Sequence, residues 1–313
     1  MPLDPPTFFR PADPSTTHAR VLRCARFGAA LALCLLPSPS RAYDSIFQRI
    51  GGDTTLAGLF PDSDARAEVQ EGFLIGTGSE AVRHLPDGRL RIERTRHYTR
   101  VRDIESGRVA NLPEAWEARS ILIVSSSLRL MAADTWLHFK RSGDGVLAGE
   151  KLSERHDWLF KVDRTSLRTA PDGKHLTYQV FLGSKRVSSE SYDYPTDTTP
   201  LEIVSLLLTV AVQRQLDAFD FQLLVPGGST HGVRAQTHRT RDLRRFAEGY
   251  RVPKTRLLSN EAQAVVDMRL ASPIKYVFFP HHFYMAFSVR EPWKLMMLWG
   301  GDPDENLQAV RIE

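Results

Sequence analysis

Alternating apolar and polar positions recur along the chain from Glu71 onward, and this period of two predicts β-strands. In residues 176–182 the even positions are Leu, Tyr, Val and Leu, and Thr, Gln and Phe stand between them. Similar alternation occupies residues 136–140, 219–225 and 266–270. Because successive side chains of a strand point to opposite faces, each of these segments has one face suited to a core.

Short turn sequences separate the alternating segments. Leu85–Gly88 and Ala170–Gly173 both carry Pro-Asp-Gly after an apolar residue. In such a turn Pro presets φ, Asp caps the turn and Gly takes the positive φ. Residues 142–145 and 226–229 are further Gly-containing reversals. Strands joined by short turns pair antiparallel, so we expect about ten strands in one large sheet.

One segment, TPLEIVSLLLTVAVQRQL from Thr199, has a helical period instead. Thr199 and Glu202 have the spacing of a capping box, and Pro200 falls at the first helical position. The polar positions, spaced three, four and four residues apart, form one narrow stripe: Glu202, Ser205, Thr209 and Gln213. A helix that is apolar around the rest must be covered on most of its surface. The prediction is a mainly β fold, an open curved antiparallel sheet (half-barrel) wrapped around one apolar helix.

This order of elements resembles a group of bacterial exported envelope proteins of unknown function, whose unclosed-barrel shape is similar to that of the periplasmic lipoprotein carriers. The residues that carry the resemblance are Tyr192–Pro195 (YDYP), Pro200–Glu202 (PLE) and Phe221–Leu224 (FQLL). It spans roughly residues 70–313 as a pattern of elements. The resemblance implies the shape and the binding of a lipid or a partner, and it brings no catalytic residues.

The N-terminal region predicts export. Three arginines precede an uncharged, mostly apolar run from Phe27 to Leu36, and Ser40-Arg41-Ala42 then supplies small residues at a cleavage site. We expect a signal peptide within residues 1–42, cleavage between Ala42 and Tyr43, and a periplasmic mature chain. A start at Val21 would give a signal peptide of ordinary length, so we interpret the first twenty residues as an extension upstream of the true start.

The mature chain is expected to have a lead-in segment, residues 43–66, and a single β-rich domain, residues 67–313. Removing residues 1–42 takes five basic and two acidic residues from totals of 41 and 37, which leaves 36 and 35 and a net charge of +1. Bulk charge then gives no reason to expect a nucleic-acid partner.

Both cysteines, Cys24 and Cys34, lie in the signal peptide, so the mature chain has no disulfide, thiolate metal site or cysteine nucleophile. We expect no cofactor, no metal, no nucleic-acid partner and no transmembrane span in the mature chain. The oligomeric state stays open at this stage.

The segment KYVFFPHHFYMAF, residues 275–287, has the densest concentration of aromatic and imidazole side chains. Neighbours in a strand point to opposite faces, so His281 and His282 cannot chelate one ion from a straight strand. We interpret the segment as an aromatic core strand with a bulge or turn at Pro280. Gly227–Gly232 has His where the nucleophile-elbow motif GxSxG requires its second Gly, so we interpret it as a tight hairpin.

Strands such as residues 293–299 are apolar on both faces, which suggests that an apolar ligand lies in a cleft between helix and sheet. The first hypothesis is a non-enzymatic envelope binding module for a lipid, an acyl chain or an envelope protein. The alternatives are a periplasmic hydrolase, whose site is assembled from scattered His, Asp and Ser residues, and a structural assembly factor. No catalytic residue is assigned. The candidate ligand-binding residues are all apolar: Leu207, Leu208, Phe283, Met285, Trp293, Met297 and Trp299.

Overall fold

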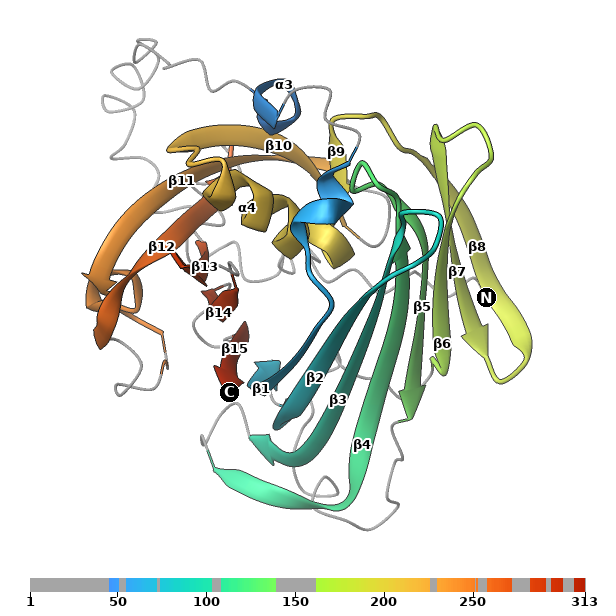
Figure 1. Cartoon of the computed structure of the whole chain (residues 1–313). Coiled ribbons are helices and arrows are strands. Elements are labelled where there is room, and N and C mark those ends of the chain that lie inside the picture. Colours follow the sequence, from blue (N-terminus) through green and yellow to red (C-terminus); the bar gives the residue numbers. More distant parts are fainter. Residues whose placement is uncertain are drawn as a thin grey trace, which may run out of the picture.

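The fold is mainly β, and the described strands form one open sheet of fifteen strands. The sheet curls around a helix (Figure 1). The computed structural model describes residues 45–50, 55–71, 74–102, 108–138, 162–225, 230–250, 252, 258–271, 282–290, 294–300 and 307–312. The expected signal peptide and its cleavage site therefore lie outside the described residues. None of the helices in these ranges has the length and apolar character that crossing a bilayer requires.

The strands run β1 (Ser63–Glu71), β2 (Leu74–His84), β3 (Leu90–Arg102), β4 (Val109–Val124), β5 (Leu130–His138), β6 (Arg164–Thr169), β7 (His175–Leu182), β8 (Lys185–Asp193), β9 (Thr198–Pro200), β10 (Ala218–Leu224), β11 (Thr230–Asp242), β12 (Leu258–Leu270), β13 (Phe283–Ser288), β14 (Leu295–Gly300) and β15 (Leu307–Ile312). Sequential strands are neighbours from β1 to β8 and from β9 to β15. The β1–β15 pair joins the two series, which leaves β8 and β9 as the edges of the open sheet.

The strand pairs are antiparallel, as expected, apart from the parallel pair of β9 with β10. The number of strands exceeds the expected number of about ten. Some hairpins turn without Pro or Gly, so the sequence does not mark where one strand ends and the next begins. Between β4 and β5, Leu128 takes the positive φ of 58° that Gly would normally supply, and its amide donates to the Ser125 carbonyl at 3.0 Å. The two Pro-Asp-Gly turns are confirmed, with φ of 80° at Gly88 and 68° at Gly173.

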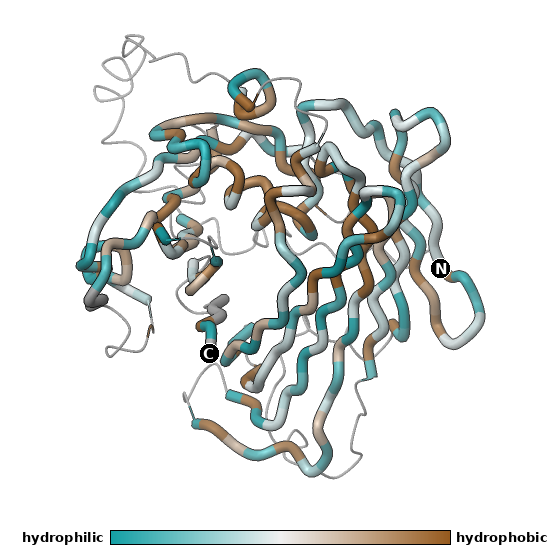
Figure 2. Tube along the Cα trace, in the orientation of Figure 1, coloured by the Kyte–Doolittle hydropathy of each residue, from teal (hydrophilic) through white to brown (hydrophobic). Residues whose placement is uncertain are grey.

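The apolar helix α4 (Val204–Gln213) lies on the concave side of the sheet, as predicted (Figure 1). Leu207 is 2% exposed and Leu208 is fully buried. Figure 2 shows the helix as a mostly hydrophobic segment, and hydrophobic stretches of the strands face it. The half-barrel wrapped around one apolar helix is therefore the observed architecture.

The start of the helix differs from the prediction. A short 3-10 helix, η4 (Leu201–Ile203), precedes α4, and neither helix has a side-chain cap. The capping box of Thr199 and Glu202 is wrong because Thr199 belongs to β9, where it pairs with Leu223. Pro200 is also extended, with ψ of 146°, so it ends the strand instead of opening a helical turn.

Three apolar clusters form among the described residues. The largest surrounds α4 and includes Ile46 of helix α3 (Ile46–Ile50) and Leu56 of helix η2 (Leu56–Leu59), so the described part of the lead-in packs into the main core. The boundary expected at residue 66 falls inside β1. A second cluster lies at the far ends of β1–β4, and a third joins β12–β14 to the segment around helix η5 (Arg244–Phe246).

Candidate functional site

The register of β2–β6 arranges the concave side chains in rows that run across the strands. The row next to α4 is apolar and buried, and its members are Val82, Ile92, Leu122, Ala133 and Leu167. The next row is polar in every strand, with Glu80 opposite Arg94, Arg94 opposite Ser120, Ser120 opposite Thr135, and Thr135 opposite Thr165. We call these five residues the polar belt.

The polar belt is half-buried, whereas the apolar row next to α4 and the apolar cluster two rows away in the other direction are buried. Toward the far ends of the strands lie Val69, Tyr98 and Trp116, which are 7%, 1% and 2% exposed. Toward α4, Ile92 and Leu122 are 0% and 1% exposed. Solvent thus reaches a layer of hydroxyl and charged groups that lies between these two buried apolar layers, and the row of Arg96 separates the belt from the far one.

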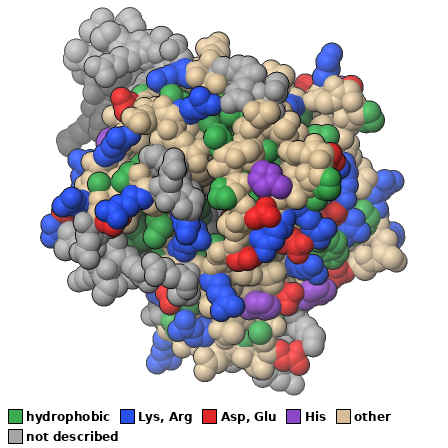
Figure 3. All heavy atoms as spheres, viewed as in Figure 1, with side chains coloured by type: hydrophobic (Ala, Val, Ile, Leu, Met, Phe, Trp, Pro, Cys, Tyr) green, Lys and Arg blue, Asp and Glu red, His purple; other side chains and the backbone are tan. Residues whose placement is uncertain are grey.

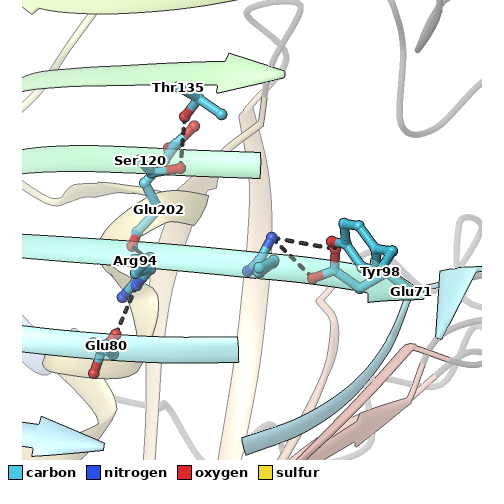
Figure 4. A network of polar contacts seen from close by, with 8 residues as sticks. Glu71, Glu80, Arg94, Tyr98, Ser120, Thr135 and Glu202 are labelled. Carbon is cyan, nitrogen blue, oxygen red and sulfur yellow. Dashed lines mark hydrogen bonds and ion pairs between the residues drawn. The ribbon is translucent and has the colours of Figure 1, made fainter. Parts of the chain in front are cut away.

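Arg94 organises the centre of the belt (Figure 4). Its Nε donates to Glu80 Oε2 at 2.6 Å, and its Nη1 donates to the Glu202 backbone carbonyl at 2.7 Å. The Arg94 side chain is only 19% exposed, so the Arg94 end of its ion pair with Glu80 is largely shielded from solvent. Ser120 and Thr135 share a hydrogen bond of 2.9 Å between their hydroxyls. Arg94 therefore ties the sheet to the turn that leads into α4.

Glu202 brings a carboxylate from η4 to the belt. In Figure 4 its side chain extends from Arg94 toward the Ser120–Thr135 pair. Burial raises the pKa of the Glu202 carboxyl above its ordinary value, although Arg94 acts in the opposite direction. Burial also raises the pKa of Tyr178, and the nearby carboxylates of Glu202 and Glu190 add to the effect. The polar stripe predicted on the helix therefore meets the polar row of the sheet at Glu202.

A second ion pair lies one row farther from α4. Arg96 Nη1 contacts Glu71 Oε1 at 2.9 Å, and the Tyr98 hydroxyl donates to the same carboxylate (Figure 4). Burial raises the pKa of Tyr98 well above its usual range, and Glu71 adds to it. The flanking positions carry small side chains, since Gly78 and Ala118 pair with Arg96 on either side.

The belt can donate and accept hydrogen bonds through its arginine, carboxylate and hydroxyl groups. In the described ranges no three His, Cys, Asp or Glu side chains are grouped to hold an ion. Arginine, carboxylate and hydroxyl groups beside apolar walls suit the polar part of a mostly apolar ligand. The sequence reading missed this layer because the belt residues are scattered between positions 80 and 165 and meet only through strand register.

The structure separates the candidate ligand-binding residues into two groups. Leu207, Leu208 and Met285 are in the core cluster around α4, and Phe283 packs against it while partly exposed. Met297 and Trp299 lie on the opposite face of the sheet, because they pair with Ala286 and Tyr284. Trp299 there donates its indole N–H to the Phe246 carbonyl at 2.8 Å. Trp293 lies outside the described residues.

The histidine segment supplies a different polar pair. His282 Nδ1 lies 2.7 Å from Asp267 Oδ1, and their side chains are 21% and 14% exposed. The imidazole stacks on Tyr284, with ring centroids 5.6 Å apart. Phe283 and Met285 face the core around α4 and Tyr284 faces away, as the strand alternation predicts. His281 and Pro280 lie outside the described residues.

The outer face of β2–β6 carries charges of both signs (Figure 3). Asp134 pairs with Arg164 at 2.9 Å and with Arg168, and Glu93 pairs with Arg91 and Arg119. Exposed ion pairs contribute little to stability, typically about 0–1 kcal/mol. We interpret this lattice of charges as a solvated surface.

Comparison with known proteins adds little to this picture. No protein-family model matches the chain, and no curated protein matches it. Among solved structures the chain is similar to a beta-barrel-like protein of a domain of unknown function (DUF1849) from Brucella abortus, with 7% sequence identity and a TM-score of 0.44. The similarity covers 80% of this chain and 95% of the other. The strand order and the position of α4 define the fold class as an open half-barrel with a central helix.

Proposed function

We propose that this protein is an exported, non-enzymatic binding module of the bacterial envelope that holds an apolar ligand, such as a lipid or acyl chain, inside the half-barrel. The observation that supports the proposal is the half-buried polar belt on the concave face, which lies between the buried apolar row next to α4 and the far apolar cluster. A concave site with apolar walls and a few converging polar groups is the usual form of a small-molecule site.

The concave face of the half-barrel has partly uncovered apolar side chains. Leu137, two residues beyond Thr135 on β5, packs against both the cluster around α4 and the far cluster, yet it is half-buried. Phe283 and Leu298, from β13 and β14, are likewise partly buried against the core around α4. An acyl chain would cover such side chains, and its polar end would meet Arg94 or the Ser120–Thr135 hydroxyls.

The test is a titration with N-phenyl-1-naphthylamine, a probe whose fluorescence rises in apolar surroundings. We expect saturable binding to the wild type and binding about tenfold weaker to Leu137→Gln, since roughly 1.4 kcal/mol of apolar contact is lost. Met131→Gln is the matched control, because Met131 lies on the same strand and is 37% exposed. It should bind the probe as the wild type does.

Absence of saturable binding, or equal binding by both variants, would contradict the proposal. The hydrolase remains a second candidate because His282 and Asp267 have the geometry of an oriented general base. Hydrolysis of a p-nitrophenyl ester that His282→Gln abolishes would favour that candidate over ligand binding.

A further inference from the structure

One edge of the open sheet is long and unpaired among the described strands. β8 (Lys185–Asp193) has β7 as its neighbour on one side, and the sheet ends there (Figure 1). The opposite edge, β9, is three residues long and ends in Pro200. An edge strand presents backbone N–H and C=O groups that can pair with another strand. β8 is therefore the edge with the capacity for strand addition.

Exposed apolar side chains mark the same hairpin. Leu182 is 50% exposed and Val187 is 37% exposed. Leu182 was expected on the buried face of its strand, but it is the last residue of β7, opposite Lys185 at the hairpin turn, and is exposed there. Both side chains lie beside the open edge, and a second strand added there would cover part of their surface.

The sequence of β8, KRVSSESYD, is complementary in charge to itself. Antiparallel pairing of two copies about Ser189 places Lys185 opposite Asp193 of the second copy, and the two-fold axis repeats the contact. The Asp193 side chain is 91% exposed, and His175 approaches it at 3.7 Å. We propose that β8 pairs with β8 of a second copy of this chain, which forms a two-fold dimer with a continuous sheet.

Edge strands are usually protected against pairing with another chain by cationic side chains and β-bulges. β8 has both features, since Lys185 and Arg186 lie beside its register shift. Cations on a strand repel an identical strand only when they face each other. In the two-fold pairing about Ser189, Lys185 faces Asp193, Arg186 faces Tyr192 and Val187 faces Ser191. Opposite charges directly across an antiparallel pair are stabilising, and like charges are destabilising. Isologous two-fold contacts are also the commonest form of homo-oligomer.

A charge-exchange experiment tests the dimer. Light scattering across a concentration series of the full chain should give twice the protomer mass at high concentration. Asp193→Lys places like charges opposite each other twice, so the dimer dissociation constant should rise about 10- to 30-fold at low salt. The double variant Lys185→Asp with Asp193→Lys restores opposite charges and should return the constant to within about threefold of the wild type.

Glu248→Lys is the control, because it makes the same charge change at an exposed position outside β8. It should leave the constant unchanged. A wild type that stays monomeric throughout the series would overturn the proposal. A dimer that Asp193→Lys leaves intact, or that the double variant fails to restore, would overturn it as well.

Discussion

Leu208 at the centre of α4 provides the sharpest test of the wrapped-helix architecture. It is fully buried, and its helix neighbours Leu207 and Val210 are 2% and 0% exposed. Leu208→Ala removes about 2–3 kcal/mol of transfer free energy and leaves a cavity, so the free energy of unfolding should fall by about 3–4 kcal/mol. Ala is the best helix former, so helix propensity does not add to the loss.

Leu201→Ala is the matched control, since Leu201 lies seven residues earlier, in η4, and is 39% exposed. Its loss should stay below about 1 kcal/mol. Urea unfolding followed by both circular dichroism and tryptophan fluorescence measures the two values and shows whether the transition is two-state. Leu208→Asp should be more harmful still, because it buries an unpaired charge. Equal losses for Leu208→Ala and Leu201→Ala would mean that α4 is not enclosed by the sheet.

Two further predictions concern Glu202 and Trp299. Burial raises the pKa of Glu202 in the folded protein above its pKa in the unfolded chain. The protonated carboxyl therefore stabilises the fold at low pH, and this stabilisation is lost as pH rises from the unfolded pKa through the folded pKa. Glu202→Gln should therefore raise the melting temperature at pH 7 and flatten its decline as pH rises above the ordinary glutamate pKa. A lower melting temperature at pH 7 would contradict this. Trp299→Phe leaves the buried Phe246 carbonyl without its donor and should reduce the free energy of unfolding by about 1–3 kcal/mol, with unchanged probe binding because Trp299 lies on the opposite face. Weakened probe binding would refute that placement.

Local sequence patterns predicted the parts of the fold that depend on neighbouring residues. The helical period around Leu207 and Leu208 indicated a covered helix, and the Pro-Asp-Gly turns ending at Gly88 and Gly173 have the expected positive φ. The capping box failed because pairing of Thr199 with β10 extends the backbone where a helix was expected.

The site depends on contacts that the sequence pattern does not contain. Residues 295–299 are apolar on both faces, so alternation alone could not show that Trp299 points away from α4. Glu80 and Arg94 belong to separate strands, and only the register of β2 with β3 places them opposite each other. The polar residues that interrupt otherwise apolar strand faces, such as Ser120 next to Leu122, were the available signal for the belt.

Native mass spectrometry of the protein purified from the envelope of its own host tests the central claim most directly. The proposed function predicts a mature chain beginning at Tyr43 that carries a noncovalently bound apolar molecule, which is released when the ions are activated. A chain that retains residues 1–42 and carries no bound molecule would contradict it.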